Sequence, residues 1–156
     1  MTVVSNTSPL NYLILIGHAD ILSKLYEAVE IPRAVFDELQ DPRSPGLVRK
    51  WMKDPPTWLR VSITVHKLDA ELEQIQIGER QAIILAQQIR SDFIILDDLR
   101  ARRIARGRNL NVVGTVGVLT SAAEQGLIDL GEAVENLRRT SFRISPALLE
   151  SLAKRE

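Results

Sequence analysis

Short runs of large apolar or β-branched residues, each followed by a longer segment with helical spacing, constrain the fold of this chain most. The runs lie at 2–5, 29–31, 59–63, 93–96 and 111–115. Runs of this length are typical of buried strands, and the segments between them have the periodicity of helices. Strands that alternate with helices predict an α/β fold, in which helices flank a central, mainly parallel sheet in three layers.

The composition bounds the class of protein. The chain has 156 residues, 45% of them hydrophobic and 26% charged, which predicts one globular domain over 1–156 with a helical tail at about 128–156. The formal net charge is zero, so any binding to nucleic acid has to be local. The absence of cysteine excludes disulfides and thiolate catalysis. We expect a cytoplasmic protein, because no apolar stretch approaches the ~20 residues that cross a bilayer and the start lacks the basic region of a signal peptide.

Two adjacent carboxylates, Asp97 and Asp98, end the apolar run at 93–96. The carboxyl ends of strands in an open α/β sheet hold the ligand crevice, so these acids lie where chemistry is expected. Acids at this position also cap the following helix, which is the structural alternative. Arg100 and Arg102 come directly afterwards. Guanidinium groups bind phosphate through paired hydrogen bonds, so we predict that this stretch holds a phosphate, with a solvated helix face as the alternative.

Three further polar side chains follow other predicted elements. Asn6 comes after the first strand, Glu38 lies on an amphipathic helix, and Glu79 follows a glycine. Together with Asp98 they would offer one amide and three carboxylates, and Mg²⁺ and Mn²⁺ prefer such oxygen ligands. Clustered carboxylates repel one another and therefore need a proton, an arginine or a metal ion. The structural alternatives are a solvated border residue for Glu38 and a favourable first-turn acid for Glu79.

Three other segments carry predictions of their own. The charged segment 65–76 is predicted to be helical. The glycines at 114–117 match neither the P-loop nor the dinucleotide pattern, so we expect them to pack a helix on the sheet, with Thr115 projecting into the crevice. The apolar faces at 127–137 and 148–152 would either form a homodimer interface or cover the sheet.

Short motifs follow one another along nearly the whole chain. They are Ser5-Asn6-Thr7-Ser8-Pro9-Leu10, Ile31-Pro32 leading to Glu38-Leu39, Gly78-Glu79-Arg80-Gln81-Ala82-Ile83, Ile95-Leu96-Asp97-Asp98, and Val113-Gly114-Thr115-Val116-Gly117. In this order and spacing they resemble the PIN-domain family of metal-dependent ribonucleases, which includes many toxins of bacterial and archaeal toxin–antitoxin pairs. The likeness is greatest to a subfamily with the Ser-Asn-Thr-Ser-Pro-Leu opening and an Asp-Asp-x-x-Ala-Arg element.

The resemblance implies a PIN-like fold and an endoribonuclease that uses Mg²⁺ or Mn²⁺, with RNA as substrate, a cognate antitoxin as partner and a homodimeric state. The metal ligands fall on Asn6, Glu38, Glu79 and Asp98, and the catalytic residues on Glu38, Glu79, Asp98 and Asp97. We assign substrate contacts to Ser8, Arg80, Arg100, Arg102 and Thr115. PIN nucleases usually have aspartate where this chain has Asn6, and a neutral amide weakens a site for divalent ions.

Two other functions remain open at this point. One is a catalytically weakened PIN-like module that binds RNA or a protein partner through the same crevice. The neutral side chain of Asn6 is the reason for considering it. The other is a receiver-like signalling domain with a phosphorylated aspartate. A receiver would need a lysine near the last strand, and the chain has none there.

Overall fold

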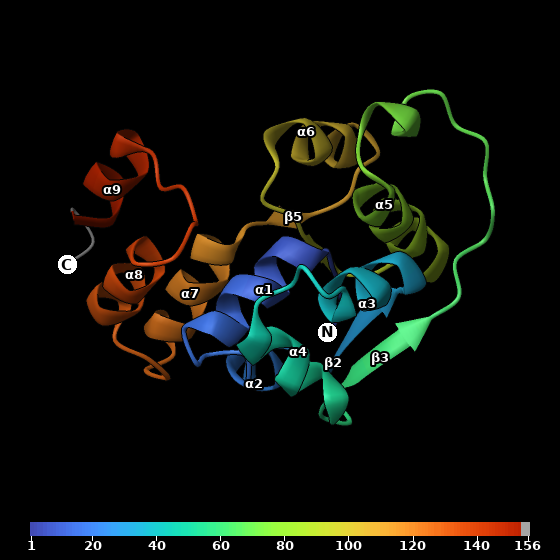
Figure 1. Ribbon diagram of the computed structural model, residues 1–156. Helices are drawn as coiled ribbons and strands as arrows, with labels where there is room; N and C mark the ends of the chain where they lie inside the picture. Colours follow the sequence, from blue (N-terminus) through green and yellow to red (C-terminus); the bar gives the residue numbers. More distant parts are fainter. Residues whose placement is uncertain (154–156) are drawn as a thin grey trace.

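Five parallel strands form the central sheet of the computed structural model, which describes residues 1–153 (Figure 1). The strands are β1 (Thr2–Ser5), β2 (Ala28–Pro32), β3 (Leu59–Ser62), β4 (Phe93–Ile95) and β5 (Val112–Val113). Their spatial order is β3-β2-β1-β4-β5, and every neighbouring pair is parallel. The predicted α/β fold with a central parallel sheet is therefore confirmed.

Helices cover both faces of this sheet, because successive residues of each strand point to opposite sides. Val3 packs with Leu10 of α1 and Leu119 of α7, whereas Val4 packs with Ile83 of α5. The helices are α1 (Thr7–Leu15), α2 (Ile21–Leu25), α3 (Arg33–Gln40), α4 (Gly46–Lys53), α5 (Ile77–Ile89), α6 (Leu99–Gly107), α7 (Thr115–Glu124), α8 (Leu130–Arg138) and α9 (Pro146–Ala153), with a 3-10 turn at Leu72–Gln74.

The central position of β1 creates the place for a ligand. Val3 pairs with Val29 of β2 on one side and with Phe93 of β4 on the other. The chain thus leaves β1 toward one edge of the sheet and later returns to its opposite side. Ligand crevices of open α/β sheets lie at such a reversal, outside the carboxyl ends of the strands. Here the reversal lies between the ends of β1 and β4.

The prediction of a helix at 65–76 is wrong. The chain from 63 to 71 is an extended strap that ends in a turn, and the 3-10 turn at Leu72–Gln74 follows it. Together they connect β3 to α5 (Figure 1). Distant side chains hold the strap: Gln88 accepts the backbone N–H of Val65 at 2.9 Å, and Arg108 Nη2 donates to Asp69 Oδ2 at 2.7 Å. These long-range hydrogen bonds give the backbone N–H of Val65 and the carboxylate of Asp69 their partners without a helix.

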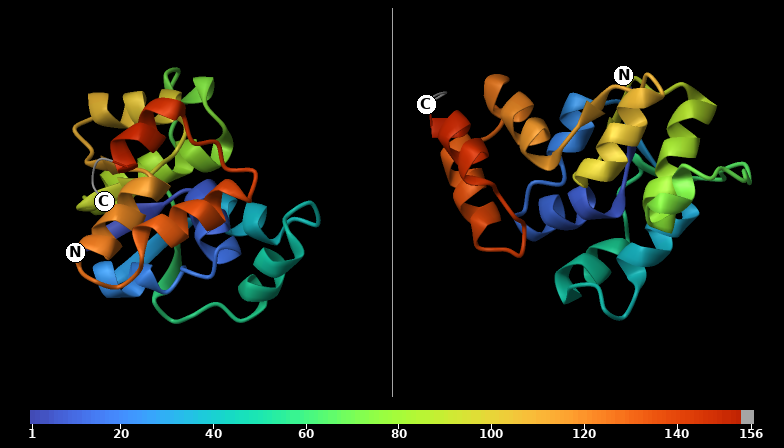
Figure 2. Two further views of the ribbon diagram at one scale, coloured as in Figure 1. Left: turned by 90° about the vertical axis from the view of Figure 1, so that its left-hand side faces the viewer. Right: turned by 90° about the horizontal axis from the view of Figure 1, so that it is seen from above.

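The C-terminal tail contains the two predicted helices, α8 and α9, and residues 154–156 of that predicted tail lie outside the described residues. Leu137 of α8 is fully buried and Leu152 of α9 is 7% exposed, α8 packs against α7, and both residues belong to the apolar cluster on this side of the sheet (Figure 2). The tail therefore packs partly within the chain, with α8 against α7 rather than over the sheet, and the homodimer interface stays a prediction. Across residues 1–153, the structure contains no helix with the length and apolar character needed to cross a membrane.

Candidate active site

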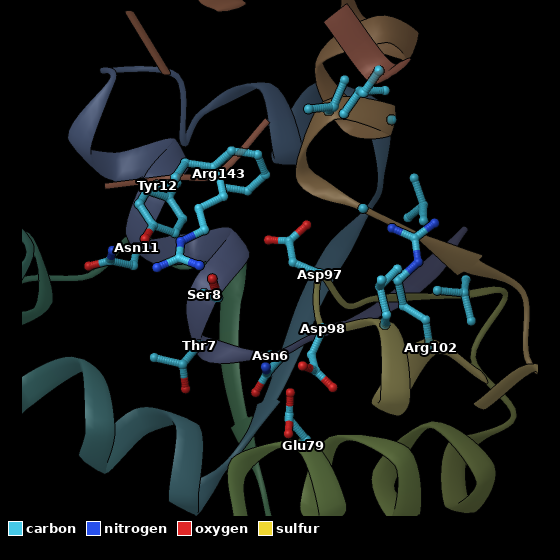
Figure 3. A pocket seen from close by; sticks show the side chains of 18 of the residues that line it. Asn6, Thr7, Ser8, Asn11, Tyr12, Glu79, Asp97, Asp98, Arg102 and Arg143 are labelled. Atoms are coloured by element: carbon cyan, nitrogen blue, oxygen red, sulfur yellow. The ribbon is translucent and has the colours of Figure 1, made fainter. Parts of the chain in front are cut away.

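A cleft of about 1630 Å³ lies at the carboxyl ends of β1 and β4 (Figure 3). Its wall includes all the predicted site residues except Thr115, namely Asn6, Ser8, Glu38, Glu79, Arg80, Asp97, Asp98, Arg100 and Arg102. They come from the end of β1, from α1 and α3, from the start of α5, and from the end of β4 with α6. Parallel strands bring their carboxyl ends to one edge, which is why residues so far apart in sequence line one cleft.

Asn6 links the first strand to the cleft. It is the N-cap of α1, and its backbone N–H donates to the carbonyl of Ile95 on β4 at 3.1 Å. The side chain of an N-cap asparagine usually accepts an N–H from the second or third helical residue. The third residue here is Pro9, which has no N–H. Asn6 Oδ1 is buried and receives no hydrogen bond from residues 1–153, so it is available to a ligand in the cleft.

Glu38 reaches the same place from α3. The hydroxyl of Thr7 donates to Glu38 Oε2 at 2.6 Å, which fixes the carboxylate against the start of α1. Gly78 makes room for it: a Cβ at this position would lie 2.6 Å from Glu38 Oε1 and 3.3 Å from Asn6 Oδ1. Glycine at position 78 therefore allows an acid of α3 and an amide at the start of α1 to lie together beside the first turn of α5.

Glu79 is the most buried acid of the cleft, with 9% of the residue exposed. Its Oε1 accepts the backbone N–H of Gln76 at 3.1 Å, as half of the capping box that begins α5. Burial raises the pKa of the Glu79 carboxyl, the Gln76 bond opposes that rise, and the charges of Asp98 and Glu38 raise the pKa further. The Glu79 carboxyl therefore lies close enough to Asp98 and Glu38 for their charges to act on it.

The two adjacent aspartates have different surroundings. Asp98 is exposed and caps α6 by accepting the N–H of Ala101 at 3.0 Å. Asp97 instead accepts the backbone N–H of Thr115 at 2.8 Å and the Thr115 hydroxyl at 2.6 Å. Burial raises the pKa of Asp97, whereas the Thr115 bonds and the charge of Arg102 oppose the rise. Asp97 therefore joins the end of β4 to the start of α7.

Thr115 and the arginines differ in how they meet the cleft. Thr115 is fully buried, and its hydroxyl is occupied by Asp97. Arg102 is half-buried beside Gly114, donates from Nη1 to the carbonyl of Leu96 at 3.4 Å, and has its pKa lowered mainly by burial. Arg80 Nε donates to the carbonyl of Ile75, between the strap and α5, at 2.8 Å. Arg100 is exposed at the rim of the cleft.

The oxygen atoms of this pocket suit a hard divalent cation. Asn6, Asp98 and Glu79 point toward one another (Figure 3). Each of the three acids, Glu38, Glu79 and Asp98, uses one carboxylate oxygen in a hydrogen bond and leaves the other without a donor from residues 1–153. Within the same range, no three His, Cys, Asp or Glu side chains are already arranged to hold a metal ion. The donor set therefore fits Mg²⁺ or Mn²⁺ chemically, but it is not a preformed three-acid site.

The structure adds residues that the sequence analysis did not assign to the site. Thr7 fixes Glu38, Gly78 gives it space, and Gly114 lies against Asp97 and Arg102. Thr7 and Gly78 each lie next to a predicted site residue, and this adjacency was the available signal. Arg143 also lines the cleft, although it lies in the tail, and nothing in its local sequence indicates that placement.

Comparisons with known proteins agree with this architecture. A family model described as PIN domain matches residues 2–155. Among solved structures, a PilT N-terminus domain protein from the archaeon Sulfolobus solfataricus P2 is similar, with a TM-score of 0.56 and 18% identity over 80% of this chain and 95% of that chain. At this identity the likeness shows the fold alone. No curated protein matches the chain. Because the family model spans nearly the whole sequence, the chain belongs to the PIN-domain family, a family with a nuclease-type fold.

Proposed function

We propose that this protein is a divalent-metal-dependent endoribonuclease that hydrolyses phosphodiester bonds of RNA. The observation that carries the proposal is the gathering of three carboxylates around the unpartnered oxygen of Asn6, in a cleft at the carboxyl edge of the sheet. Open oxygen ligands of this kind are what Mg²⁺ and Mn²⁺ sites in phosphodiester chemistry require.

In this proposal Asn6, Glu38, Glu79 and Asp98 hold the ion. When bound, Mg²⁺ or Mn²⁺ polarises a phosphoryl oxygen and lowers the pKa of water. The protein supplies the placement of the ligands: each acid lines the cleft and is anchored through one oxygen to a hydroxyl or a helix N-terminus, and its other oxygen has no donor from residues 1–153. Asp97 acts through position, because its bonds to Thr115 fix the loop that carries Asp98.

The substrate-binding part of the proposal rests on the cleft wall. Arg100 is exposed at the rim and is placed to meet a phosphate, and Ser8 lies in the first turn of α1. Arg80 and Arg102 also line the cleft, but both are part-buried and each donates to a backbone carbonyl, whereas Arg100 is exposed and its own bond to the Gln74 carbonyl is long, at 3.5 Å. We therefore expect Arg100 to affect RNA affinity directly, and Arg102 to affect mainly the shape of the wall. We expect Thr115 to affect RNA binding only indirectly, because its N–H and hydroxyl donate to Asp97.

The test is cleavage of single-stranded and structured RNA in the presence of Mn²⁺. The site variant is the double substitution Glu38→Gln with Asp98→Asn, and a matched control carries Glu27→Gln with Asp54→Asn. The control removes the same two charges at exposed positions that do not line the cleft. Cleavage should be lost in the site variant and kept in the control. Equal cleavage by wild type and the site variant would show a contaminating nuclease and end the proposal.

One observation favours a second candidate, a catalytically weakened module that binds RNA or a protein. The ligand set contains the neutral Asn6, and the described acids do not form a ready three-acid group. Asn6→Asp separates the two candidates. If the wild type cleaves RNA slowly or not at all and Asn6→Asp gains both Mn²⁺ affinity and cleavage, the module is supported. Tight Mn²⁺ binding by the wild type would contradict the module, because the module assumes that Asn6 weakens the metal site.

A finer proposal follows from the toxins of the PIN family. We propose that the protein acts in the cytoplasm as a homodimeric toxin whose cognate antitoxin covers part of its surface. The strap presents Ile63 and Leu68, which are 89% and 87% exposed, and exposed apolar side chains of this kind often mark protein-binding surfaces. Induced expression should arrest growth, co-expression of an adjacent small gene should relieve the arrest, and light scattering should give a dimer mass. Normal growth and a monomer mass would contradict this proposal.

A further inference from the structure

The cleft continues beyond the acids to the C-terminal tail. Its far wall is formed by the later part of α7 and by the segment 141–152, which includes α9. In Figure 3 the guanidinium of Arg143 lies on one side of Ser8, while the carboxylates of Asp98 and Glu79 lie on the other. A strand of nucleic acid that follows this cleft from the acids therefore passes the tail. The wall there also contains Glu124, so it is not uniformly basic.

The segment that carries Arg143 is fixed to α1. The rings of Tyr12 and Phe142 form an edge-to-face pair with centroids 5.0 Å apart, and the Tyr12 hydroxyl is 2.9 Å from Ser141 Oγ. On the other side of Arg143, Ser145 Oγ accepts the N–H of Leu148 and begins α9. An aromatic pair and hydrogen bonds thus flank Arg143 on both sides and restrict where its guanidinium can reach.

Arg143 differs from the other arginines of the cleft in its partners. Arg80, Arg100 and Arg102 each donate to a backbone carbonyl. Arg143 has no hydrogen-bond or carboxylate partner among residues 1–153, and its side chain points into the cleft toward Ser8 and Asn11 (Figure 3). A guanidinium with all of its donors available, held beside the positive end of α1, is suited to a phosphate group.

We propose that Arg143 binds a backbone phosphate of the RNA strand, at a distance from the bond that is cut, and that the tail thereby forms part of the substrate path. This proposal rests on the proposed function, since it places the same substrate in the same cleft. It assigns the C-terminal segment a role in binding in addition to its role in covering the core. Removal of the Arg143 contact should weaken RNA binding without changing the acids.

The test measures binding without cleavage. A labelled short single-stranded RNA is titrated by fluorescence anisotropy in EDTA at several salt concentrations, with wild type, Arg143→Ala, Arg143→Lys and Arg139→Ala. Arg139 is the matched control, because it is an exposed arginine of the same tail that does not line the cleft. Arg143→Ala should weaken binding about tenfold and reduce the slope of log affinity against log salt by about 0.7. Arg143→Lys should keep the slope and lose part of the affinity.

The outcomes separate this inference from the proposed function. If Arg143→Ala and Arg139→Ala bind RNA with the same affinity and salt slope, the inference is overturned, whether or not the wild type cleaves RNA. If Arg143→Ala binds RNA more weakly while the wild type shows no cleavage with Mn²⁺, the phosphate contact of Arg143 is supported and the proposed nuclease activity is refuted. Circular dichroism checks the fold of each variant. If the alanine variant does not fold, Arg143→Lys is compared with Arg139→Ala in affinity alone, because Arg143→Lys is expected to keep the salt slope, and equal affinity then overturns the inference.

Discussion

Gly78→Ala tests whether Glu38 and Asn6 hold a metal ion in the positions that the structure shows. The added Cβ would lie 2.6 Å from Glu38 Oε1, so the carboxylate must move by about 0.8 Å to reach an ordinary non-bonded distance. Thr7 holds the other carboxylate oxygen at 2.6 Å and restricts this movement. Metal–ligand distances tolerate only about 0.2 Å. We therefore expect the affinity for Mn²⁺ to fall about ten- to a hundredfold, as it does when the supporting contacts of a ligand are lost.

The stability of the fold should change little in the same variant. Alanine in place of a helical glycine stabilises by up to about 1 kcal/mol, which offsets part of the steric cost, so the melting temperature should stay within about 4 °C of the wild type. Gly107→Ala is the control, because a Cβ at the end of α6 meets no atom within 4 Å. Calorimetric titration with Mn²⁺ and thermal unfolding measure both effects. Unchanged Mn²⁺ affinity in Gly78→Ala would refute the assignment of Glu38 as a ligand, and no uptake by the wild type would refute the metal site.

Three further predictions concern the surroundings of the site. Asp97→Ala leaves the N–H and hydroxyl of buried Thr115 without an acceptor, and we expect a loss of about 3 kcal/mol in the free energy of unfolding, or roughly 6–12 °C in melting temperature. A shift below about 2 °C would contradict the anchoring role of Asp97. The raised pKa of Glu79 means that the folded state binds more protons than the unfolded state above the ordinary value of 4.5, so this group lowers stability as pH rises through that range. Glu79→Gln keeps the capping box and should gain melting temperature relative to the wild type from pH 4.5 upward; a pH-independent difference would contradict this. Arg108→Ala removes the donors that hold Asp69 of the strap, so limited proteolysis should cut the strap faster than in wild type, and an unchanged cleavage rate would show that other contacts suffice.

The fold could be predicted because its signals are local. Each strand is a short apolar run, and the run at 93–96 carries its own termination signal in the acids that follow. Parallel topology then determines which strand ends meet, so the meeting of Asn6 and Asp98 at one cleft required no knowledge of individual contacts, whereas Glu79 lies in the first turn of α5 and not at a strand end. From the sequence, the structural alternatives are a helix cap for Asp98 and a favourable first-turn acid for Glu79. In the structure both accept a backbone N–H at a helix start through one carboxylate oxygen, which leaves the other oxygen for the proposed ligand role.

The features that could not be predicted depend on contacts between distant residues. The strap at 63–71 looked helical from its charge pattern, but Gln88 and Arg108 bind its backbone and side chains and keep it extended. Pro9, which removes one of the two N–H groups that an N-cap side chain can accept, is visible in the sequence, yet its effect on Asn6 Oδ1 depends on where the helix begins. Arg143 reaches the cleft because the tail folds back over Tyr12, and no local pattern encodes that return.

The helices that begin at the cleft have a consequence for how the protein exists before any ion is loaded. Helices α1, α5 and α6 all begin at residues of the candidate site, so three positive helix ends face the carboxylates. These dipoles offset the mutual repulsion of the acids in the way that a counter-charge would. The apoprotein should therefore stay folded. Under the proposed function, the supply of divalent ions, rather than new synthesis or refolding, would set when the protein becomes active.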